Sequence, residues 1–340
     1  MMKRREFLKI SATGLAGAAG AIGMLSWMPR AYAATVSKTY YITEGLIAFP
    51  GQVNGTPADV DVYFKGFSSA SNTLTVPGES FIVQEGDTVE VTIVNTLDTT
   101  HSFVIDGMVD SGPIAGGQTK TVSFTANSVG SHLFYDSTNA PYNRLVGLHG
   151  GMAVMPFGSS NELYAGSPTF TQQLFWVMHD IDPDWHARIQ NGQTPNTTYT
   201  PRHFTLNGLI GRPPGAVGSK DPAVDAMVAP GTALHGHVGE PALLRVLNPG
   251  KCMHSVHTHG NHMHWLTSNG QVRPAIWQKD IVPMDGNMGK VDVIFPFEAP
   301  PDAWPQVTTG IYAMHLHDEM TQTSGGGYYM FGNITDIFFE

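Results

Sequence analysis

Residues 86–95 read GDTVEVTIVN, and residues 239–248 read GEPALLRVLN. After five intervening residues, each stretch is followed by a histidine and a serine, with His101 in the first copy and His254 in the second. The spacing between the opening glycine and the histidine is the same in both copies. Such agreement over a long range indicates an internal repeat, in which one structural unit occurs twice.

The repeated unit has the pattern of β structure. Val89, Val91 and Ile93 alternate with polar residues, which is typical of a half-buried strand. A second pair of stretches, GSHLFY at 130–135 and GIYAMH at 310–315, supports the same repeat. We therefore predict an all-β fold of two Greek-key β-sandwich domains, at residues 34–165 and 166–340.

The composition agrees with this fold and limits the partners. The 38 Gly and 23 Pro among 340 residues suit many short strands joined by tight turns. Cys252 is the only cysteine, so the chain has no internal disulfide and depends on packed cores of its own. The formal net charge of -10 argues against nucleic acid as a partner.

Within the second unit, the polar and proline-containing stretch 182–201 is predicted to be a surface loop.

The first 33 residues are predicted to be a twin-arginine export signal. Arg4 and Arg5 precede an apolar run at 10–27, and the small-x-small triplet at 31–33 offers a cleavage site before Ala34. A membrane anchor is the alternative, but the run is barely long enough to span and only weakly apolar. We therefore expect a mature chain of 34–340 in the periplasm or outside the cell, without a stable membrane span.

Two His-x-His pairs lie in the second unit, one near its middle and one near its end. Residues two apart on a strand share a face, so His257 and His259 point one way, and His315 and His317 can do the same from a neighbouring strand. Four imidazoles could then converge on one metal ion. Imidazole suits copper, zinc, iron or nickel, so the ligand set alone leaves the metal open.

The remaining histidines carry weaker patterns. A lone histidine is more often an ordinary surface or core residue than a ligand. His262 and His264 could be either. No partner spacing accompanies six others, which we read as structural: His149, His179, His186, His203, His235 and His237.

The segments 254–260 and 315–317 resemble motifs of the multicopper oxidase family, which includes laccases and copper nitrite reductases. The resemblance implies cupredoxin-like domains, copper as cofactor and an oxidoreductase activity. It implies that His257 and His259 stand where the family has one type 2 and one type 3 ligand, and that His315 and His317 stand where it has two type 3 ligands. His254 stands where a type 1 histidine occurs.

The sequence also departs from the family pattern. Leu316 replaces the cysteine between the paired histidines, and Thr321 replaces the later type 1 histidine. Without a thiolate there is no blue copper centre. Cys252 could be a relocated thiolate, although a structural cysteine is the simpler interpretation.

The first unit lacks most of the expected ligands. By the resemblance, its four ligand positions fall at Val104, Asp106, Tyr135 and Ser137. His101 remains and is predicted to reach a metal across a domain or subunit interface, as His132 could also do.

These features predict a copper oxidoreductase with a reduced, type 2-like site of one or at most two copper ions, acting on a small molecule or a metal ion. The resemblance also implies a homotrimer. One alternative is a non-catalytic copper-binding or copper-delivery protein, because thioether sulfur favours Cu(I) and methionines accompany the histidines. Another is a cupredoxin scaffold without metal. The methionines concerned are Met253, Met263, Met284, Met288, Met314, Met320 and Met330.

Overall fold

The computed structural model describes residues 30–53, 56–159, 161–196, 198–210, 232–300, 307–325, 328–329 and 332–340. The predicted export signal lies almost entirely outside the described residues. Among the described residues, no helix is long and apolar enough to cross a membrane.

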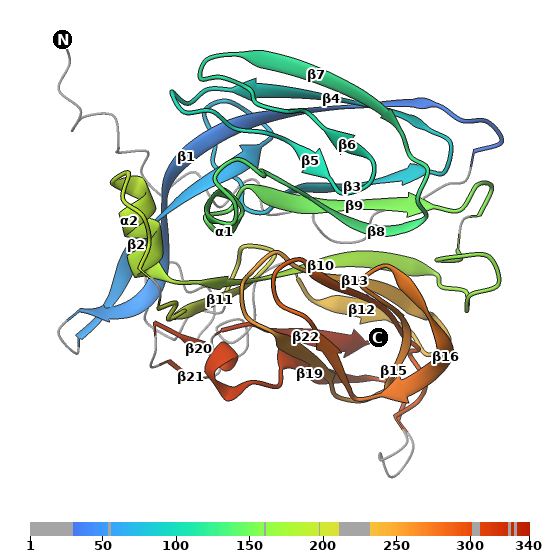
Figure 1. The fold of residues 1–340 in the computed structure, drawn as a ribbon. Helices are drawn as coiled ribbons and strands as arrows, with labels where there is room; N and C mark the ends of the chain where they lie inside the picture. The colour runs from blue at the N-terminus through green and yellow to red at the C-terminus, as the bar shows by residue number, and fades with distance from the viewer. Residues whose placement is uncertain are drawn as a thin grey trace.

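The first sandwich, coloured blue to green in Figure 1, contains two sheets. One sheet has the strand order β2, β1, β4, β7, and these strands are β2 Thr56–Ser68, β1 Thr35–Val53, β4 Thr88–Asn95 and β7 Thr119–Thr125. The other sheet has the order β3, β9, β8, β5, β6, and these strands are β3 Gly78–Gln84, β9 His149–Met155, β8 Gly130–Tyr135, β5 Val104–Ile105 and β6 Val109–Asp110. The short helix α1 (Tyr142–Leu145) lies between β8 and β9 in the chain.

The second sandwich lies below the first in Figure 1 and contains a six-stranded and a five-stranded sheet. The six-stranded sheet has the order β11 His203–Leu206, β10 Gln172–Ile181, β13 Ala242–Asn248, β18 Gly289–Phe295, β15 Met263–Ser268 and β16 Gln271–Lys279. The five-stranded sheet has the order β12 Leu234–Gly236, β22 Ile334–Phe339, β19 Gly310–Leu316, β14 His254–Thr258 and β17 Ile281–Met284. The remaining elements are helix α2 Pro183–Gln190, the 3-10 turn η2 Glu319–Gln322 and the paired strands β20 Thr323–Ser324 and β21 Tyr328–Tyr329.

The two halves repeat the same strand arrangement. β4 lies between parallel β1 and antiparallel β7, and its counterpart β13 lies between parallel β10 and antiparallel β18. β8 and β19, which carry the second repeated stretch, each lie between two antiparallel neighbours. The predicted all-β fold of two sandwiches is therefore confirmed. The exact boundary at 165/166, which falls between β9 and β10, stays a prediction.

Each sandwich encloses an apolar core between its sheets. Val89, Val91 and Ile93, the residues that decided the strand prediction, are each 0% exposed and pack in the first core. In the second core, Val256 of β14 and Leu316 of β19 pack against residues of β10, β13 and β18. Burying each such side chain contributes about 1.5–3 kcal/mol, which compensates for the missing disulfides.

Polar and apolar contacts join the two sandwiches. Arg245 of β13 is fully buried and donates a hydrogen bond from Nη1 to Ser131 Oγ of β8 at 2.9 Å. Ser131 in turn donates to Asp292 of β18. Because breaking a buried ionic network is costly, these contacts fix how one sandwich lies on the other.

The stretch predicted to be a loop at 182–201 contains helix α2, so that prediction is wrong for its first half. The Asp182 side chain accepts hydrogen bonds from the backbone N–H groups of Asp184 and Trp185, and Pro183 occupies the first turn. Proline suits this position because the first helical N–H has no partner inside the helix. An aspartate followed by proline therefore marked a helix start rather than a loop.

Candidate metal centre

The alternation of side chains along β14 separates its histidines into two sets. His254, Val256 and Thr258 point into the core and are at most 2% exposed. His257 is only partly buried and points to the other face, and His259 just beyond the strand is exposed. This follows from the two-residue period of a strand.

The neighbouring strand β19 brings a third histidine to the same face. His257 and His315 are direct partners in the antiparallel pairing of β14 with β19. Their ring centroids are 5.0 Å apart, and the ring of His259 lies 4.6 Å from that of His257. Direct partners bring their side chains close together, so the register of the two strands builds this cluster.

The rings of His257, His259 and His315 bring three nitrogen atoms within 4.8 Å of one another. Nε2 of His259 and Nε2 of His315 are 3.2 Å apart. No other group of three His, Cys, Asp or Glu side chains with this proximity occurs in the described ranges. We call these three residues the triad.

Backbone carbonyl groups orient two members of the triad. Nδ1 of His257 lies 3.0 Å from the carbonyl oxygen of Asp280, and Nδ1 of His315 lies 3.0 Å from that of Leu316. Donation from Nδ1 leaves the Nε2 lone pair free, which is the tautomer that a metal-ligating histidine needs. The contact to Asp280 could not be read from the sequence, because it involves the backbone of a residue 23 positions away.

The surroundings lower the pKa of two of the imidazoles and so favour their neutral form. Burial lowers the pKa of His257 against the opposing effect of its hydrogen bond to Asp280, and the neighbouring His259 and His315 lower the pKa further. Burial and the nearby His315 and His317 lower the pKa of His259. Neutral imidazole is the metal-binding form, so this arrangement favours a bound cation.

His317 lies at the edge of the triad. Its ring centroid is 5.2 Å from that of His257 and 6.1 Å from that of His315, and its side chain is exposed. The structure thus brings three of the four paired histidines into one cluster and leaves the fourth at its rim.

His254 is not part of the triad. It is 2% exposed, and its Nε2 lies 3.5 Å from Oδ1 of Asp180 on β10. Neither ring nitrogen has a hydrogen-bond partner in the described part of the chain. The three-residue separation from His257 places it on the opposite face of β14.

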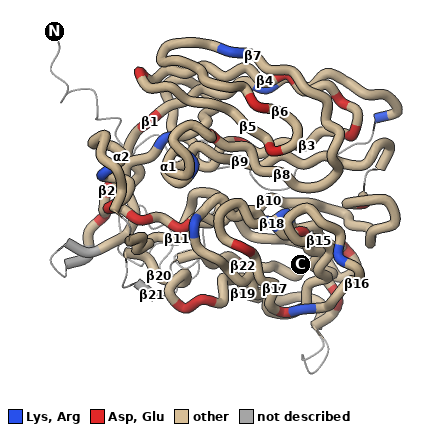
Figure 2. The backbone as a smooth tube through the Cα atoms, viewed as in Figure 1, with Lys and Arg blue, Asp and Glu red and all other residues tan. Residues whose placement is uncertain are grey.

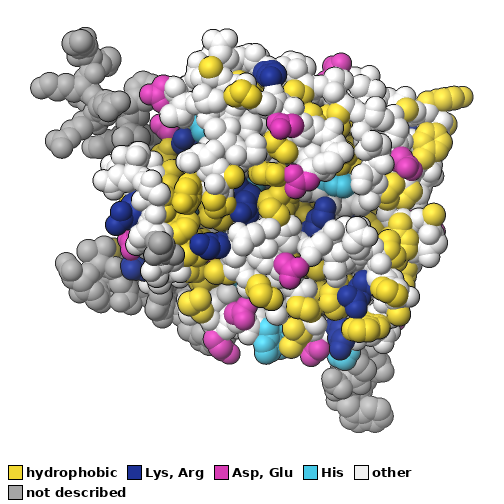
Figure 3. All heavy atoms as spheres, viewed as in Figure 1, with side chains coloured by type: hydrophobic (Ala, Val, Ile, Leu, Met, Phe, Trp, Pro, Cys, Tyr) yellow, Lys and Arg dark blue, Asp and Glu magenta, His cyan; other side chains and the backbone are white. Residues whose placement is uncertain are grey.

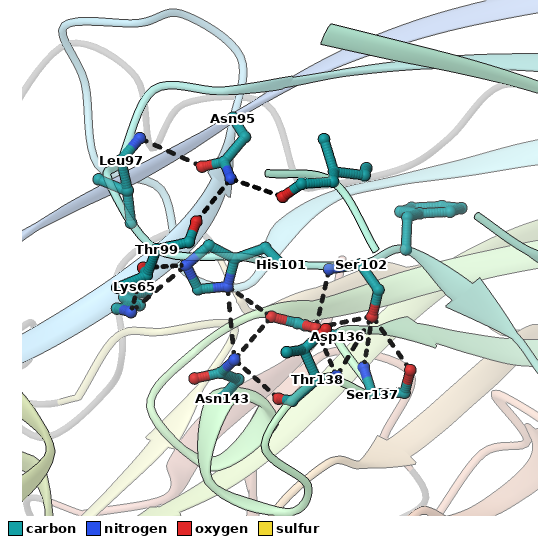
Figure 4. A network of polar contacts seen from close by, with 12 residues as sticks. Lys65, Asn95, Leu97, Thr99, His101, Ser102, Asp136, Ser137, Thr138 and Asn143 are labelled. Atoms are coloured by element: carbon teal, nitrogen blue, oxygen red, sulfur yellow. Dashed lines mark hydrogen bonds and ion pairs between the residues drawn. The ribbon is translucent and has the colours of Figure 1, made fainter. Parts of the chain in front are cut away.

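His101 also lies elsewhere, inside the first sandwich (Figure 4). Its Nδ1 donates to Oδ2 of the fully buried Asp136 at 2.6 Å, and its Nε2 lies 2.8 Å from Oγ1 of Thr99. Asp136 additionally accepts hydrogen bonds from Asn143 and from Ser102. Both ring nitrogens of His101 are therefore engaged within its own domain.

Cys252 has the character of a protonated thiol. Burial, together with the nearby carboxylate of Asp180, raises the pKa of Cys252 to about 12. Because only a thiolate binds a metal strongly, this environment agrees with the interpretation of Cys252 as a structural residue.

Comparison with known proteins relates the chain to copper enzymes. Residues 70–158 match the family model described as "Multicopper oxidase". The chain is 23% identical over 219 residues to a copper-containing nitrite reductase of Pseudomonas chlororaphis, which covers 58% of this chain and 56% of that protein. It is 24% identical over 268 residues to a copper-containing nitrite reductase of Rhizobium meliloti, covering 72% and 64%. The matches thus span less than two thirds of these relatives' own length.

Solved structures agree at the level of the fold. The blue copper oxidase of Nitrosomonas europaea superposes with a TM-score of 0.66 at 18% identity, covering 89% of this chain and 85% of that one. The two sandwiches are therefore cupredoxin-like domains.

Proposed function

We propose that the chain is an exported copper-dependent oxidoreductase of the multicopper oxidase type with one type 2-like copper. The match of residues 70–158 to that family's model and the similarity to copper-containing nitrite reductases support this proposal. His257, His259 and His315 would hold the ion. His317 at the rim is available as a fourth ligand. Copper, when bound, supplies one-electron redox chemistry and Lewis acidity.

The observation that carries this proposal is the proximity of three ring nitrogens within 4.8 Å in the triad. A free Nε2 on His257 and on His315, each fixed by a carbonyl group behind it, is the ligand geometry that such a site requires. The site opens to solvent through the exposed His259, so a small substrate can approach it. The exposed imidazole of His317 is positioned to exchange a proton with a molecule bound there.

The proposed enzyme lacks a type 1 electron entry port. The position of the thiolate is filled by Leu316, which is 0% exposed, and the position of the later histidine is filled by Thr321, which is 2% exposed. Electrons would therefore pass directly between the substrate and the triad, which favours small substrates that reach the ion itself.

Metal analysis with electron paramagnetic resonance tests the proposal. We expect about one copper per chain, a type 2 spectrum and no intense blue absorption band. His257→Ala should lower copper affinity by at least about tenfold, since loss of a residue that merely orients a ligand already costs that much. His262→Ala, which removes an exposed imidazole outside the triad, is the matched control and should bind like the parent. Retention of copper by His257→Ala would refute the assignment.

Copper delivery is a second candidate function. Met320 is 55% exposed and lies three residues after His317 in the chain. Its thioether sulfur, which favours Cu(I), is therefore close in sequence to the exposed histidine at the rim of the triad. A delivery protein would surrender its copper to a competing chelator within minutes and would not turn over phenols, nitrite or metal ions. An oxidoreductase would keep its copper and turn over at least one of them.

Export through the twin-arginine signal and assembly as a homotrimer are part of the same proposal. Fractionation of cells producing the Arg4→Lys, Arg5→Lys variant tests export, because loss of the arginine pair should leave the protein in the cytoplasm. Light scattering of the purified chain tests the trimer.

A further inference from the structure

A second group of reactive side chains surrounds His101 in the first sandwich (Figure 4). Nε2 of His101 lies 2.8 Å from the hydroxyl oxygen Oγ1 of Thr99, and Nδ1 of His101 lies 2.6 Å from Oδ2 of Asp136. A hydroxyl, an imidazole and a carboxylate are thus hydrogen-bonded in series. With both distances between about 2.6 and 3.2 Å, this is the arrangement by which proteins activate a hydroxyl as a nucleophile.

The direction of each hydrogen bond follows from the groups involved. The carboxylate of Asp136 accepts, so Nδ1 of His101 carries the proton and Nε2 presents a lone pair. Thr99 donates its hydroxyl proton to this lone pair, because Nζ of Lys65 lies farther away, at 3.4 Å. His101 is therefore in the tautomer that a general base for the Thr99 hydroxyl needs.

The three side chains reach from the interior of the sandwich to its surface. His101 and Asp136 are each 0% exposed, whereas Thr99 is exposed. Nδ2 of Asn143 donates to Oδ2 of Asp136 at 2.9 Å, and Nδ2 of Asn95 donates to the carbonyl oxygen of Thr99 at 2.8 Å. The base is therefore fixed and shielded from water, while a molecule in solution can approach the nucleophile.

A buried cation lies beside the same hydroxyl. Lys65 of β2 is 7% exposed, and its Nζ donates to Oγ1 of Thr99 at 3.4 Å. Burial lowers the pKa of Lys65. Three nearby carboxylates oppose that shift and so favour the ammonium form, those of Glu44, Asp136 and Asp98. An ammonium group at this distance stabilises the negative charge that develops on Oγ1 as its proton leaves.

We propose that Thr99 is a nucleophile that takes an acyl group from small activated esters, with His101 as its general base. In the first step the Thr99 oxygen bonds to the carbonyl carbon of the ester, the ester C–O bond breaks, and His101 passes the hydroxyl proton to the departing alkoxide. In the second step a water molecule attacks the acyl group. His101 passes a proton of that water to the Thr99 oxygen, and the carboxylic acid leaves.

This site is separate from the triad, which belongs to β14 and β19 of the second sandwich. The reaction transfers an acyl group and no electrons, so it does not depend on copper. Because Thr99 lies at the surface, the leaving group stays in water, which favours small esters with good leaving groups.

Reaction of the metal-free full chain with p-nitrophenyl acetate, stopped with acid, tests this inference. Peptide mass spectrometry locates the acetyl group and measures how fast each residue is acetylated. Acetylation of Thr99 is expected in the parent. His101→Gln keeps the Thr99 hydroxyl but removes the base, so it should slow acetylation of Thr99 by about 100-fold or more. Thr99→Ser presents the same hydroxyl and should be acetylated at that position.

The neighbouring Thr100, which is also exposed, is the matched control. In the parent it should be acetylated about 100-fold more slowly than Thr99, because a free hydroxyl is a weak nucleophile. Thr100→Val should change the acetylation rate of Thr99 by no more than about twofold, since surface substitutions have small effects.

The inference is overturned if Thr99 stays unmodified in the parent, if it reacts no faster than Thr100, or if His101→Gln leaves its rate unchanged. Should His101→Gln not fold, the comparison of Thr99 with Thr100 in the parent still decides.

Asp136 is a positioning residue, since it orients His101 and does not touch the ester. Nitrogen-15 NMR of the His101 ring tests this role, because it reports which ring nitrogen carries the proton. The parent should show a protonated Nδ1. Folded Asp136→Asn should lose that preference and acetylate Thr99 more slowly. An unchanged tautomer with an unchanged rate would contradict the positioning role.

Discussion

At the scale of single residues, Asp136 and Leu316 show how one repeat produced two different environments. They hold equivalent places after the matching stretches of β8 and β19. In the first sandwich the carboxylate of Asp136 lies 2.6 Å from Nδ1 of His101 and makes a hydrogen bond with it. In the second sandwich the carboxylate of Asp180 lies 3.5 Å from Nε2 of His254, and neither ring nitrogen of His254 has a hydrogen bond within the described residues. The alternation of side chains along a strand was enough to predict that the histidines at 257 and 259 share a face. Asp136 as the partner of His101 could not be predicted in this way, because 35 residues separate them.

Asp136→Asn should lower the free energy of unfolding by about 2–4 kcal/mol, because it weakens an acceptor that several buried donors share. Urea unfolding followed by circular dichroism measures this loss. Asp98→Asn, in an exposed loop of the same sandwich, should change stability by no more than about 0.5 kcal/mol. If the two variants lose similar amounts of unfolding free energy, the hydrogen bonds of Asp136 are not what stabilises this sandwich.

At the scale of elements, the strands were predictable and helix α2 was not. A two-residue period is local and visible in sequence, so β4 and β13 follow from it directly. α2 is short, polar on most of its surface and rich in residues common in loops. Its position is fixed by tertiary contacts, such as the hydrogen bond from His186 Nδ1 to the carbonyl oxygen of Tyr63 at 2.6 Å.

Asp182→Ala should cost about 1–2 kcal/mol of stability, because the buried Asp182 carboxylate caps α2 and also accepts from the N–H of Thr200 at 2.6 Å. The neighbouring Asp184→Ala should cost about 0.5 kcal/mol or less, since its ion pair to Arg202 is exposed. Thermal unfolding of both variants checks the difference. A larger effect at Asp184 would show that charge near the helix end, rather than capping, is what stabilises α2.

At the scale of the whole molecule, the internal repeat predicted the two sandwiches, but the contact between the two sandwiches could not be predicted from the sequence. The family model matches residues 70–158, in the half that lacks the histidine pairs. Contacts such as Arg245 with Ser131 join residues 114 positions apart and leave no local pattern. The buried imidazoles of His149, His179 and His186 were likewise read only as structural, without a location.

Acid should destabilise the folded chain between about pH 6.5 and pH 4. Burial lowers the pKa of His179 to about 4, that of His186 to about 3 and that of His203 to about 4. The unfolded chain then binds more protons than the folded one, so the stability is present above pH 6.5 and is lost as the pH falls toward 4. Each imidazole contributes on the order of 1–3 kcal/mol.

Urea midpoints of the metal-free chain at pH 7 and pH 5 measure this loss, and His186→Gln should reduce the difference between them. A midpoint that does not change with pH would mean that these imidazoles are solvated in the native state. His235→Gln, at an exposed position, is the matched control.

The pairing of His257 with His315 joins two strands that are neighbours in space and distant along the chain. An ion shared by these rings would serve as a removable cross-link between the middle of the second domain and its final hairpin. Metal loading would then decide how tightly the end of the polypeptide is held, and a cell short of metal would contain a looser, more readily degraded form of the same chain.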